Sequence, residues 1–180
     1  MKIISYKVVE STNLKAKDLV KKKAKPWTVV VSERQTQGYG RKGNKWYSPK
    51  GGLYFSIILP SHFQGSGRSL QDKLKNLQIL TILAAFAVGK VIKNNFALEP
   101  FIKLPNDVWV NGKKIAGILV ENVIGKKLKS SIMGIGVNTN IVRFPKELEN
   151  KATSLKKELR KEVDNQKILK EIVKEIKAFF

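Results

Sequence analysis

The dipeptide Asn111-Gly112 constrains the fold of this chain more than any other feature of its sequence. Asn-Gly between two apolar runs is a strong signal for a tight β-hairpin, because both positions tolerate positive φ. The flanking runs, Val108 to Val110 and KIAGILVEN, are therefore expected to pair antiparallel. A second hairpin is predicted through Ile124-Gly125, leading into SIMGIGVNTN. Consecutive hairpins argue against a doubly wound parallel sheet and favour an α+β fold with a mixed, mainly antiparallel sheet flanked by helices.

The remaining segments are expected to supply helices and further strands. Ser11 suits the N-cap of a helix that reaches about Lys21. The segment from Ser69 to Asn94 is rich in Leu, Ile, Ala and Phe, which predicts a long buried helix. The segment from Asp164 to Phe180 predicts an amphipathic helix. Further strands are expected at Ile3 to Val9, Thr28 to Glu33, Gly52 to Pro60 and Phe101 to Lys103.

One folded domain covering residues 1–180 is expected, because this length supports a single core and no linker or repeat interrupts it. The chain has no cysteine, which excludes disulfides and thiolate chemistry. Its first residues, MKIISYKVVEST, lack the apolar region of a secretory signal. The longest apolar run, near Leu80 to Val88, is too short to cross a bilayer. We therefore expect a soluble, cytoplasmic protein without a membrane partner.

Positive charge dominates the composition. The formal net charge is +21, from 35 Lys and Arg against 14 Asp and Glu. Such an excess attracts anionic partners, which include nucleotides, nucleic acids and acidic proteins. Basic residues near both ends of the chain agree with ordinary solvated surfaces. Between Glu33 and Asp72, in contrast, the chain carries Lys and Arg but no acid at all.

That interval contains the loop QTQGYGRKGNKWYSPKGG, from Gln35 to Gly52. Its glycines allow backbone N–H groups to turn toward an anion, while Arg41 and Lys42 add positive charge. Trp46 and Tyr47 offer flat surfaces to a ring. The spacing matches neither a P-loop nor a dinucleotide fingerprint. We interpret the loop as a binding loop for an anionic ligand, in preference to a mobile surface loop. The glycines concerned are Gly38, Gly40 and Gly43.

The stretch KLPNDVWVNGKKIAGILVE combines one carboxylate with an amide and several lysines. Asp107 follows Asn106, and Pro105 fixes the turn that aims both side chains. A carboxylate oxygen for Mg²⁺ beside cations for phosphate is the composition of a magnesium–nucleotide site. Two simple turns remain the alternative interpretation of this stretch.

Glycines interrupt two of the predicted strands. Gly117 in IAGILVE and Gly134 and Gly136 in GIGVNTN weaken a strand unless a ligand or another backbone approaches closely. Asn138, which follows, supplies an amide suited to a base or ribose. The residues ESTN, which include Ser11, Thr12 and Asn13, are either a helix cap or the contacts of a small polar ring.

These motifs, taken in order, resemble the catalytic domain of biotin–protein ligases. The matching stretches span roughly residues 8 to 155 and are ESTN, QTQGYGRKGNKWYSPKGGLYFS, KLPND, KKIAGILVE, GIGVNTN and ATSL. The resemblance implies the fold shared by biotin ligases and class II aminoacyl-tRNA synthetases. It also implies a two-step reaction that uses ATP and Mg²⁺. The biotin carboxylate would attack the α-phosphate of ATP to give biotinyl-5′-AMP, and a lysine of a biotin carboxyl carrier protein would then accept the biotin.

The resemblance further implies a role for each matching residue. Lys114 and Arg41 would be the catalytic cations, and Asp107 would hold Mg²⁺. The implied biotin-binding residues are Ser11, Thr12, Asn13, Gln35, Gly38, Arg41, Lys114, Gly117, Gly134 and Gly136. The implied nucleotide-binding residues are Arg41, Lys42, Trp46, Asn106, Lys114 and Asn138. No nucleophilic side chain is needed, and His62, outside the motifs, is interpreted as a surface residue.

The chain departs from the family pattern at several points. Tyr39 and Asn44 stand where the family usually has arginine, so the loop would hold the adenylate with two charges fewer. KLPND replaces the usual KWPND, an exchange of one apolar residue for another. We expect no N-terminal helix-turn-helix domain, so the repressor activity of some family members is not expected, and we also expect no C-terminal β-barrel. A homodimer through exposed strand edges is compatible with the family.

Three other interpretations of the sequence are alternatives to a biotin–protein ligase. Lipoate–protein ligases share the fold and the adenylation chemistry, but their glycine motif usually ends in a histidine that this loop lacks. A basic nucleic-acid-binding module would suit the net charge. No RNA- or zinc-binding pattern appears, however, so no specific nucleic acid is expected. A non-catalytic biotin-binding relative is opposed by the presence of Lys114 and Asp107.

Overall fold

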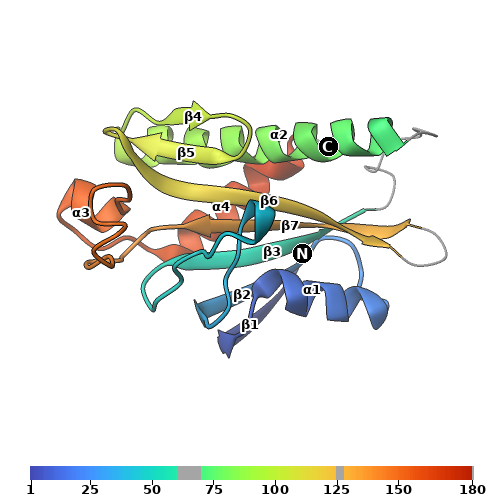
Figure 1. The fold of residues 1–180 in the computed structure, drawn as a ribbon. Helices are drawn as coiled ribbons and strands as arrows, with labels where there is room; N and C mark the ends of the chain where they lie inside the picture. The colour runs from blue at the N-terminus through green and yellow to red at the C-terminus, as the bar shows by residue number, and fades with distance from the viewer. Residues whose placement is uncertain (61–69, 125–127, 180) are drawn as a thin grey trace.

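The computed structural model describes residues 1–60, 70–124 and 128–179, which form one mixed sheet with helices on both faces (Figure 1). The strands are β1 (Lys2–Val9), β2 (Thr28–Gln35), β3 (Leu53–Leu59), β4 (Phe101–Lys103), β5 (Asp107–Val110), β6 (Lys113–Ile124) and β7 (Leu128–Val137). The helices are α1 (Thr12–Lys21), α2 (Leu70–Phe96), α3 (Leu155–Leu159) and α4 (Asn165–Lys177). The strand order is β1-β2-β3-β7-β6-β5-β4. The predicted α+β architecture is confirmed.

The first predicted hairpin is present and built as expected. Strands β5 and β6 pair antiparallel on either side of Asn111 and Gly112, whose φ values are 49° and 72°. Strands β6 and β7 also pair antiparallel, as the second predicted hairpin requires. Its turn, through Ile124-Gly125, lies largely outside the described residues, as does His62. The sequence does not predict a partner for the N-terminal strand. In the structure β1 pairs parallel with β2, and α1 forms the crossover between them.

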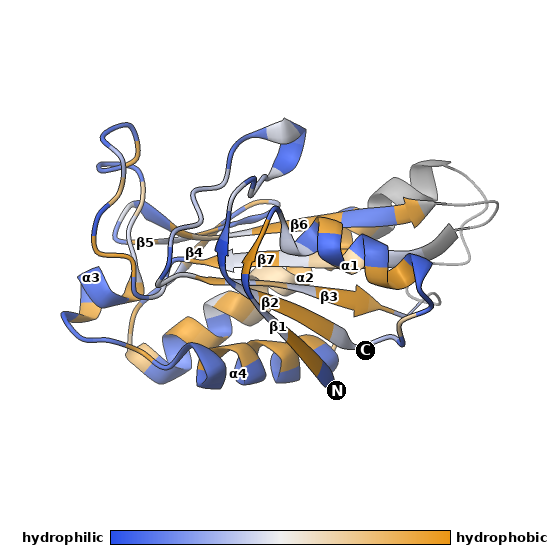
Figure 2. Cartoon of the chain, turned by 90° about the horizontal axis from the view of Figure 1, so that it is seen from below, coloured by the Kyte–Doolittle hydropathy of each residue, from blue (hydrophilic) through white to orange (hydrophobic). Residues whose placement is uncertain are grey.

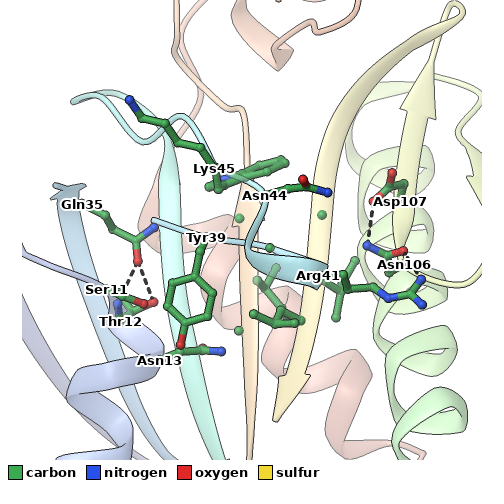
Figure 3. A pocket seen from close by; sticks show the side chains of 18 of the residues that line it. Ser11, Thr12, Asn13, Gln35, Tyr39, Arg41, Asn44, Lys45, Asn106 and Asp107 are labelled. Carbon is green, nitrogen blue, oxygen red and sulfur yellow. Dashed lines mark hydrogen bonds between the residues drawn. The ribbon is translucent and has the colours of Figure 1, made fainter. Parts of the chain in front are cut away.

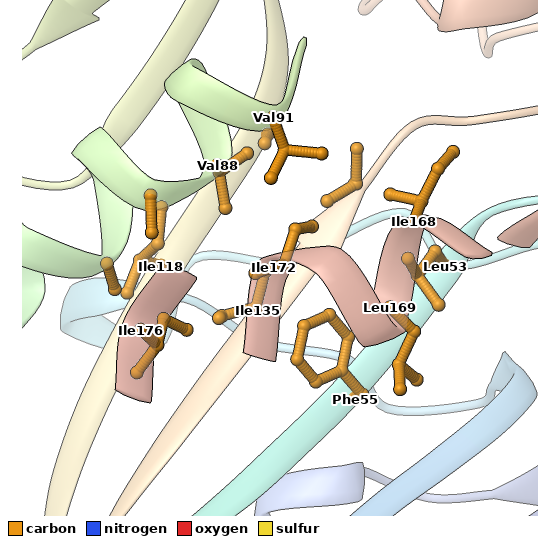
Figure 4. Close-up of a cluster of buried hydrophobic side chains, with 14 of the residues drawn as sticks. Leu53, Phe55, Val88, Val91, Ile118, Ile135, Ile168, Leu169, Ile172 and Ile176 are labelled. Atoms are coloured by element: carbon orange, nitrogen blue, oxygen red, sulfur yellow. The ribbon is translucent and has the colours of Figure 1, made fainter. Parts of the chain in front are cut away.

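The hydrophobic core is divided by the sheet into two layers. Side chains of β2 alternate between its faces, because successive residues of a strand point in opposite directions. Val29 and Val31 enter the larger cluster, which α2 and α4 cover, whereas Val30 enters the smaller cluster beneath α1. Helix α4 packs along the sheet through Ile168, Leu169, Ile172 and Ile176 (Figure 4). Figure 2 shows that its outward side is hydrophilic. This packing leaves the loop after β2 free to cross the sheet on the α1 side.

Helix α2 corrects the expectation that the longest apolar run of the chain is too short to cross a bilayer. The window from Leu77 to Phe96 is long and apolar enough to cross a bilayer, by length and composition alone. Half of that window is buried within the protein, where Ala84, Val88 and Ile92 belong to the core. The central helix of a globular core meets the same criterion, and the packing of α2 against β6 and α4 assigns it that role.

Candidate active site

A cavity of about 340 Å³ lies where the glycine-rich loop passes over the middle of the sheet. Its walls come from the start of α1, the loop after β2, the β4–β5 turn, and strands β6 and β7. The predicted site residues that line it are Ser11, Thr12, Asn13, Gln35, Arg41, Lys42, Trp46, Asn106, Asp107, Lys114, Gly117, Gly134 and Gly136. Segments more than a hundred residues apart in the chain therefore meet at one cavity.

Two predicted site residues are placed elsewhere. Gly38 lies inside the loop, where an added Cβ would stand 2.5 Å from Ser48 Oγ and 2.8 Å from the Trp46 carbonyl oxygen. Its lack of a side chain therefore allows the loop to close on itself, and Gly38 does not line the cavity. Asn138 lines an adjoining cavity instead.

The adjoining cavity, of about 300 Å³, shares Lys45, Trp46 and Lys114 with the first. Its walls are mainly aromatic and aliphatic. Besides the shared residues and Asn138, it is lined by Tyr47, Trp109, Phe144, Leu148, Lys151 and Ala152. The sequence does not predict Trp109 or Phe144 at the site, because Trp109 is an apolar strand residue within KLPNDVWVNGKK and Phe144 lies outside the motifs. The two cavities together could receive a ligand with two parts that meet beside Lys114.

One end of the first cavity is polar and uncharged. The Thr12 backbone N–H donates to Gln35 Oε1 at 2.8 Å, and the Thr12 hydroxyl lies 3.2 Å from the same oxygen. The Gln35 amide nitrogen donates to Ser48 Oγ at 2.9 Å. Ser11 occupies the N-cap position of α1, yet its side chain makes no capping hydrogen bond. The hydroxyl of Ser11 is thus free of the capping role that the sequence suggested, and it faces the cavity (Figure 3).

Glu121 of β6 collects three hydrogen bonds at the edge of this polar end. Asn13 Nδ2 and Lys17 Nζ each donate to its carboxylate at 2.8 Å, and the Tyr39 hydroxyl donates at 2.9 Å. Burial alone would raise the pKa of Glu121, but these donors outweigh burial and lower it. Burial would lower the pKa of Lys17, and the Glu121 carboxylate raises it instead. Burial and the carboxylate together raise the pKa of Tyr39, which keeps its hydroxyl protonated as a donor.

The opposite end of the cavity is charged. Lys114 Nζ lies 2.7 Å from Asp107 Oδ1, and Asn106 Nδ2 donates to the same carboxylate oxygen at 2.9 Å. Arg41 Nη1 donates to Asn106 Oδ1 at 3.2 Å. Figure 3 places Arg41, Asn106 and Asp107 on one side of the cavity and Ser11, Thr12 and Gln35 on the other, with the loop between them. Paired cations and a neutral hydrogen-bonding end suit a ligand that carries its negative charge at one end.

Glycines form the floor between these two ends, and Trp46 lies on it. A Cβ at Gly117 would stand 3.0 Å from the indole, and one at Gly136 would collide with the indole nitrogen. The Lys114 ammonium lies 5.1 Å from the centre of the same ring. The Trp46 indole N–H is buried without a hydrogen-bond partner. At Gly134, a Cβ would collide with the Asn13 carboxamide. The three glycines therefore leave room for the side chains of Trp46 and Asn13.

The fit of a Mg²⁺ ion can be judged from the donor set. Among the described residues no group of three or more His, Cys, Asp or Glu side chains could enclose a metal ion. Mg²⁺ commonly uses one or two carboxylates together with substrate phosphates, and Asp107 offers one carboxylate at the charged end of the cavity. The residues therefore fit a metal shared with phosphate, not a metal held by protein alone.

Comparison with known proteins assigns this fold and its two adjoining cavities to one protein family. The chain belongs to the biotin/lipoate A/B protein ligase family, whose sequence profile matches residues 5–138. It is 35% identical over 175 residues to the bifunctional ligase/repressor BirA of Bacillus subtilis, covering 95% of this chain and 51% of that protein. It is 33% identical over 114 residues to the biotin–[acetyl-CoA-carboxylase] ligase of Paracoccus denitrificans, covering 61% of this chain and 43% of that protein.

Solved structures agree with these relatives. The biotin protein ligase of Aquifex aeolicus in complex with biotin and ATP matches with a TM-score of 0.82 and 32% identity, over 98% of this chain and 69% of that one. The Leishmania major enzyme in complex with biotinyl-5-AMP matches with a TM-score of 0.74 and 25% identity, over 97% and 73% of the two chains. The chain spans about half the length of the Bacillus subtilis relative.

Proposed function

We propose that this chain is an ATP-dependent biotin–protein ligase. The observation that carries the proposal is the pair of adjoining cavities that share Lys114 and Trp46. A carboxylate ligand in the first cavity and a nucleotide base in the second would meet at Lys114. This is the arrangement that formation of a mixed anhydride with AMP requires. Family membership and the Aquifex aeolicus complex with biotin and ATP support the same conclusion.

In this proposal the polar end of the first cavity holds the ureido ring of biotin. Such a ring carries two N–H donors and a carbonyl acceptor. Ser11, Thr12 and Gln35 present hydroxyl and amide groups that can match both kinds. Gly117 and Gly136 provide the floor, and Asn13 is held in place beside Gly134 by Glu121 and Ser56. The biotin carboxylate would then point toward Lys114 and Arg41.

Adenylation needs fixed positive charge where a carboxylate approaches a phosphate. Lys114 and Arg41 would supply it, and both are positioned in advance by Asp107 and Asn106. Mg²⁺, when bound, would neutralise phosphate charge, with Asp107 as its protein ligand. Lys42 would add charge from the loop, and Asn138, in the second cavity, would bind the nucleotide. The Trp46 indole would turn away from the glycine floor to make room and would cover the adenylate, while the Trp46 backbone stays in the loop.

The second substrate would be a lysine of a biotin carboxyl carrier protein. A net charge of +21 would speed the encounter with an acidic carrier domain. We place the reaction in the cytoplasm, which agrees with a sequence without cysteine. A homodimer would use an edge of the sheet, where β4 carries the exposed side chain of Phe101, followed by that of Leu104.

The test is the complete reaction with purified protein. Incubation with biotin, ATP, Mg²⁺ and a biotin carboxyl carrier domain is expected to add one biotinyl group to one lysine, detected by mass spectrometry. Lipoate offered with a lipoyl domain serves as the control, because the family also contains lipoate ligases. Transfer of lipoate in place of biotin would reassign the substrate, and transfer of neither would contradict the proposal.

A further inference from the structure

Tyr39 connects the glycine-rich loop to the floor of the site. The loop forms a small hairpin, in which Tyr39 and Lys45 make a β-bridge and the Trp46 N–H donates to the Gly38 carbonyl at 2.8 Å. The residues at its tip, from 41 to 45, are exposed. The hydroxyl of Tyr39 extends from this hairpin to Glu121 of β6, 82 residues further along the chain. The side chain of Tyr39 thus forms a direct hydrogen bond between the covering loop and the central sheet.

The acceptor of this bond is itself held rigidly. Glu121 also accepts from Lys17 and Asn13 of α1, and Asn13 accepts from the buried Ser56 of β3 at 2.6 Å. Hydrogen bonds to an ionised acceptor are stronger than those between neutral groups. The second contact from the loop, Arg41 to Asn106, is solvent-exposed and longer, at 3.2 Å. Water competes with an exposed bond of this kind, so the Tyr39 bond is the stronger of these two hydrogen bonds.

The charge balance explains why a neutral donor suits this position. Lys17 already provides one positive charge for Glu121 at 2.8 Å. Biotin ligases usually have arginine where this chain has Tyr39, and an arginine would bring a second cation to one carboxylate. The tyrosine supplies a hydrogen bond without an added charge. It leaves the polar end of the cavity electrically neutral, as a ureido ring requires.

We propose that Tyr39 is a positioning residue that fastens the glycine-rich loop over the site through Glu121. The fastened loop is in place before the ligand arrives, so less ordering is required on binding. It also slows the escape of the reactive adenylate into water. Tyr39 touches no reacting atom in this role. The functional part of this inference rests on the proposed ligase activity, whereas the fastening of the loop does not.

The first part of the test needs no ligand. Amide hydrogen exchange is measured for Gly40, Asn44 and Trp46, whose N–H groups are hydrogen-bonded within the hairpin. Tyr39→Phe removes the hydroxyl and keeps the ring, so exchange at these amides is expected to rise about tenfold while β6 and β7 stay protected. Tyr6→Phe, on strand β1, is the matched control and is expected to leave the loop unchanged. Equal loop exchange in wild type and Tyr39→Phe would overturn the fastening.

A double-mutant cycle assigns the effect to Glu121. In the Glu121→Ala background, Tyr39→Phe is expected to add nothing to loop exchange, because its partner is already gone. An undiminished effect of Tyr39→Phe in that background would also overturn the proposal.

The second part measures function. Tyr39→Phe is expected to raise the Kd for biotin and the rate at which biotinyl-5′-AMP escapes, each about tenfold, with little change in adenylation at saturating biotin. If Tyr39→Phe speeds hydrogen exchange in the loop but leaves the Kd for biotin and the escape rate of biotinyl-5′-AMP unchanged, the positioning role is wrong. The conclusion that Tyr39 fastens the loop would still stand. If the wild-type protein forms no biotinyl-5′-AMP, the proposed ligase function is wrong. The hydrogen-exchange measurement still tests whether Tyr39 fastens the loop, because it needs no ligand.

Discussion

Gly136 lies so close beneath the indole of Trp46 that a β-carbon at this position would collide with the indole nitrogen. The sequence predicts a close approach at Gly117 and Gly136, because glycine inside a strand is otherwise unfavourable. It does not identify the approaching group, since Trp46 is 90 residues away along the chain from Gly136. The same limit applies to Glu121, which ends the matching stretch KKIAGILVE but has no role predicted from sequence. Only the folded sheet brings its carboxylate to Tyr39, Asn13 and Lys17.

Gly136→Ala is expected to lower the free energy of unfolding by about 1–3 kcal/mol, because Trp46 must move from its place. Urea denaturation measures the change. In the Trp46→Ala background the cost of Gly136→Ala should shrink markedly, since the colliding ring is absent. If Gly136→Ala lowers the free energy of unfolding equally in the wild-type and Trp46→Ala backgrounds, the collision with Trp46 is not the reason why position 136 needs glycine.

Helix α1 is attached to the sheet by charge as well as by apolar packing. Ala16 is buried in the smaller core cluster, while Lys17 and Asn13 bind the Glu121 carboxylate of β6. The lowered pKa of Glu121 reports this attachment, because it reflects donors that favour the ionised form. A carboxylate whose folded pKa lies below its ordinary value of 4.5 stabilises the fold above that pH. The contribution is lost as the pH falls through the folded pKa.

Glu121→Gln is expected to reduce the free energy of unfolding by about 1–3 kcal/mol at neutral pH. The difference from wild type should narrow as the pH falls from 4.5 through the lower folded pKa of Glu121, at which the native carboxylate becomes protonated. Urea denaturation at several pH values measures it, with the exposed Glu149→Gln as the control. A difference that is constant with pH would contradict an ionic role for Glu121.

Local features of the elements were predicted better than their arrangement. The Asn111-Gly112 hairpin is fixed by adjacent residues, and β5 and β6 follow it as expected. The parallel pairing of β1 with β2 and the contact of β3 with β7 join segments that are distant in the chain. Sequence patterns give the length and period of a strand but not its neighbour. The short helix α3 was not predicted, because five residues carry little periodic signal.

At the scale of the whole molecule, the +21 charge bears on partners more than on the fold. The described part of the chain buries one continuous core between the sheet and helices α2 and α4. Both cavities adjoin the glycine-rich loop, and their walls include basic side chains from several elements. An acidic acceptor domain would be drawn to this face before its lysine reaches the adenylate.

The rate of transfer to an acidic carrier domain is therefore expected to depend on salt. Raising the ionic strength from about 0.05 to 0.3 M should lower kcat/KM for the carrier several-fold, because it screens charges at long range. Adenylation of free biotin, assayed in parallel, should change much less. A transfer rate independent of salt would contradict electrostatic steering by the net charge.

The most direct test of the central claim is biotin-dependent ATP–pyrophosphate exchange in two neighbouring lysine variants. Lys114 lies at the junction of both cavities, 2.7 Å from Asp107, whereas Lys113 lines neither of them. Lys114→Ala is expected to lower the exchange rate by a factor of about 100 or more, because it removes charge that stabilises the transition state. Lys113→Ala is expected to retain the wild-type rate. Exchange that survives Lys114→Ala, or that never depends on biotin, would contradict the assignment of this site to biotin adenylation.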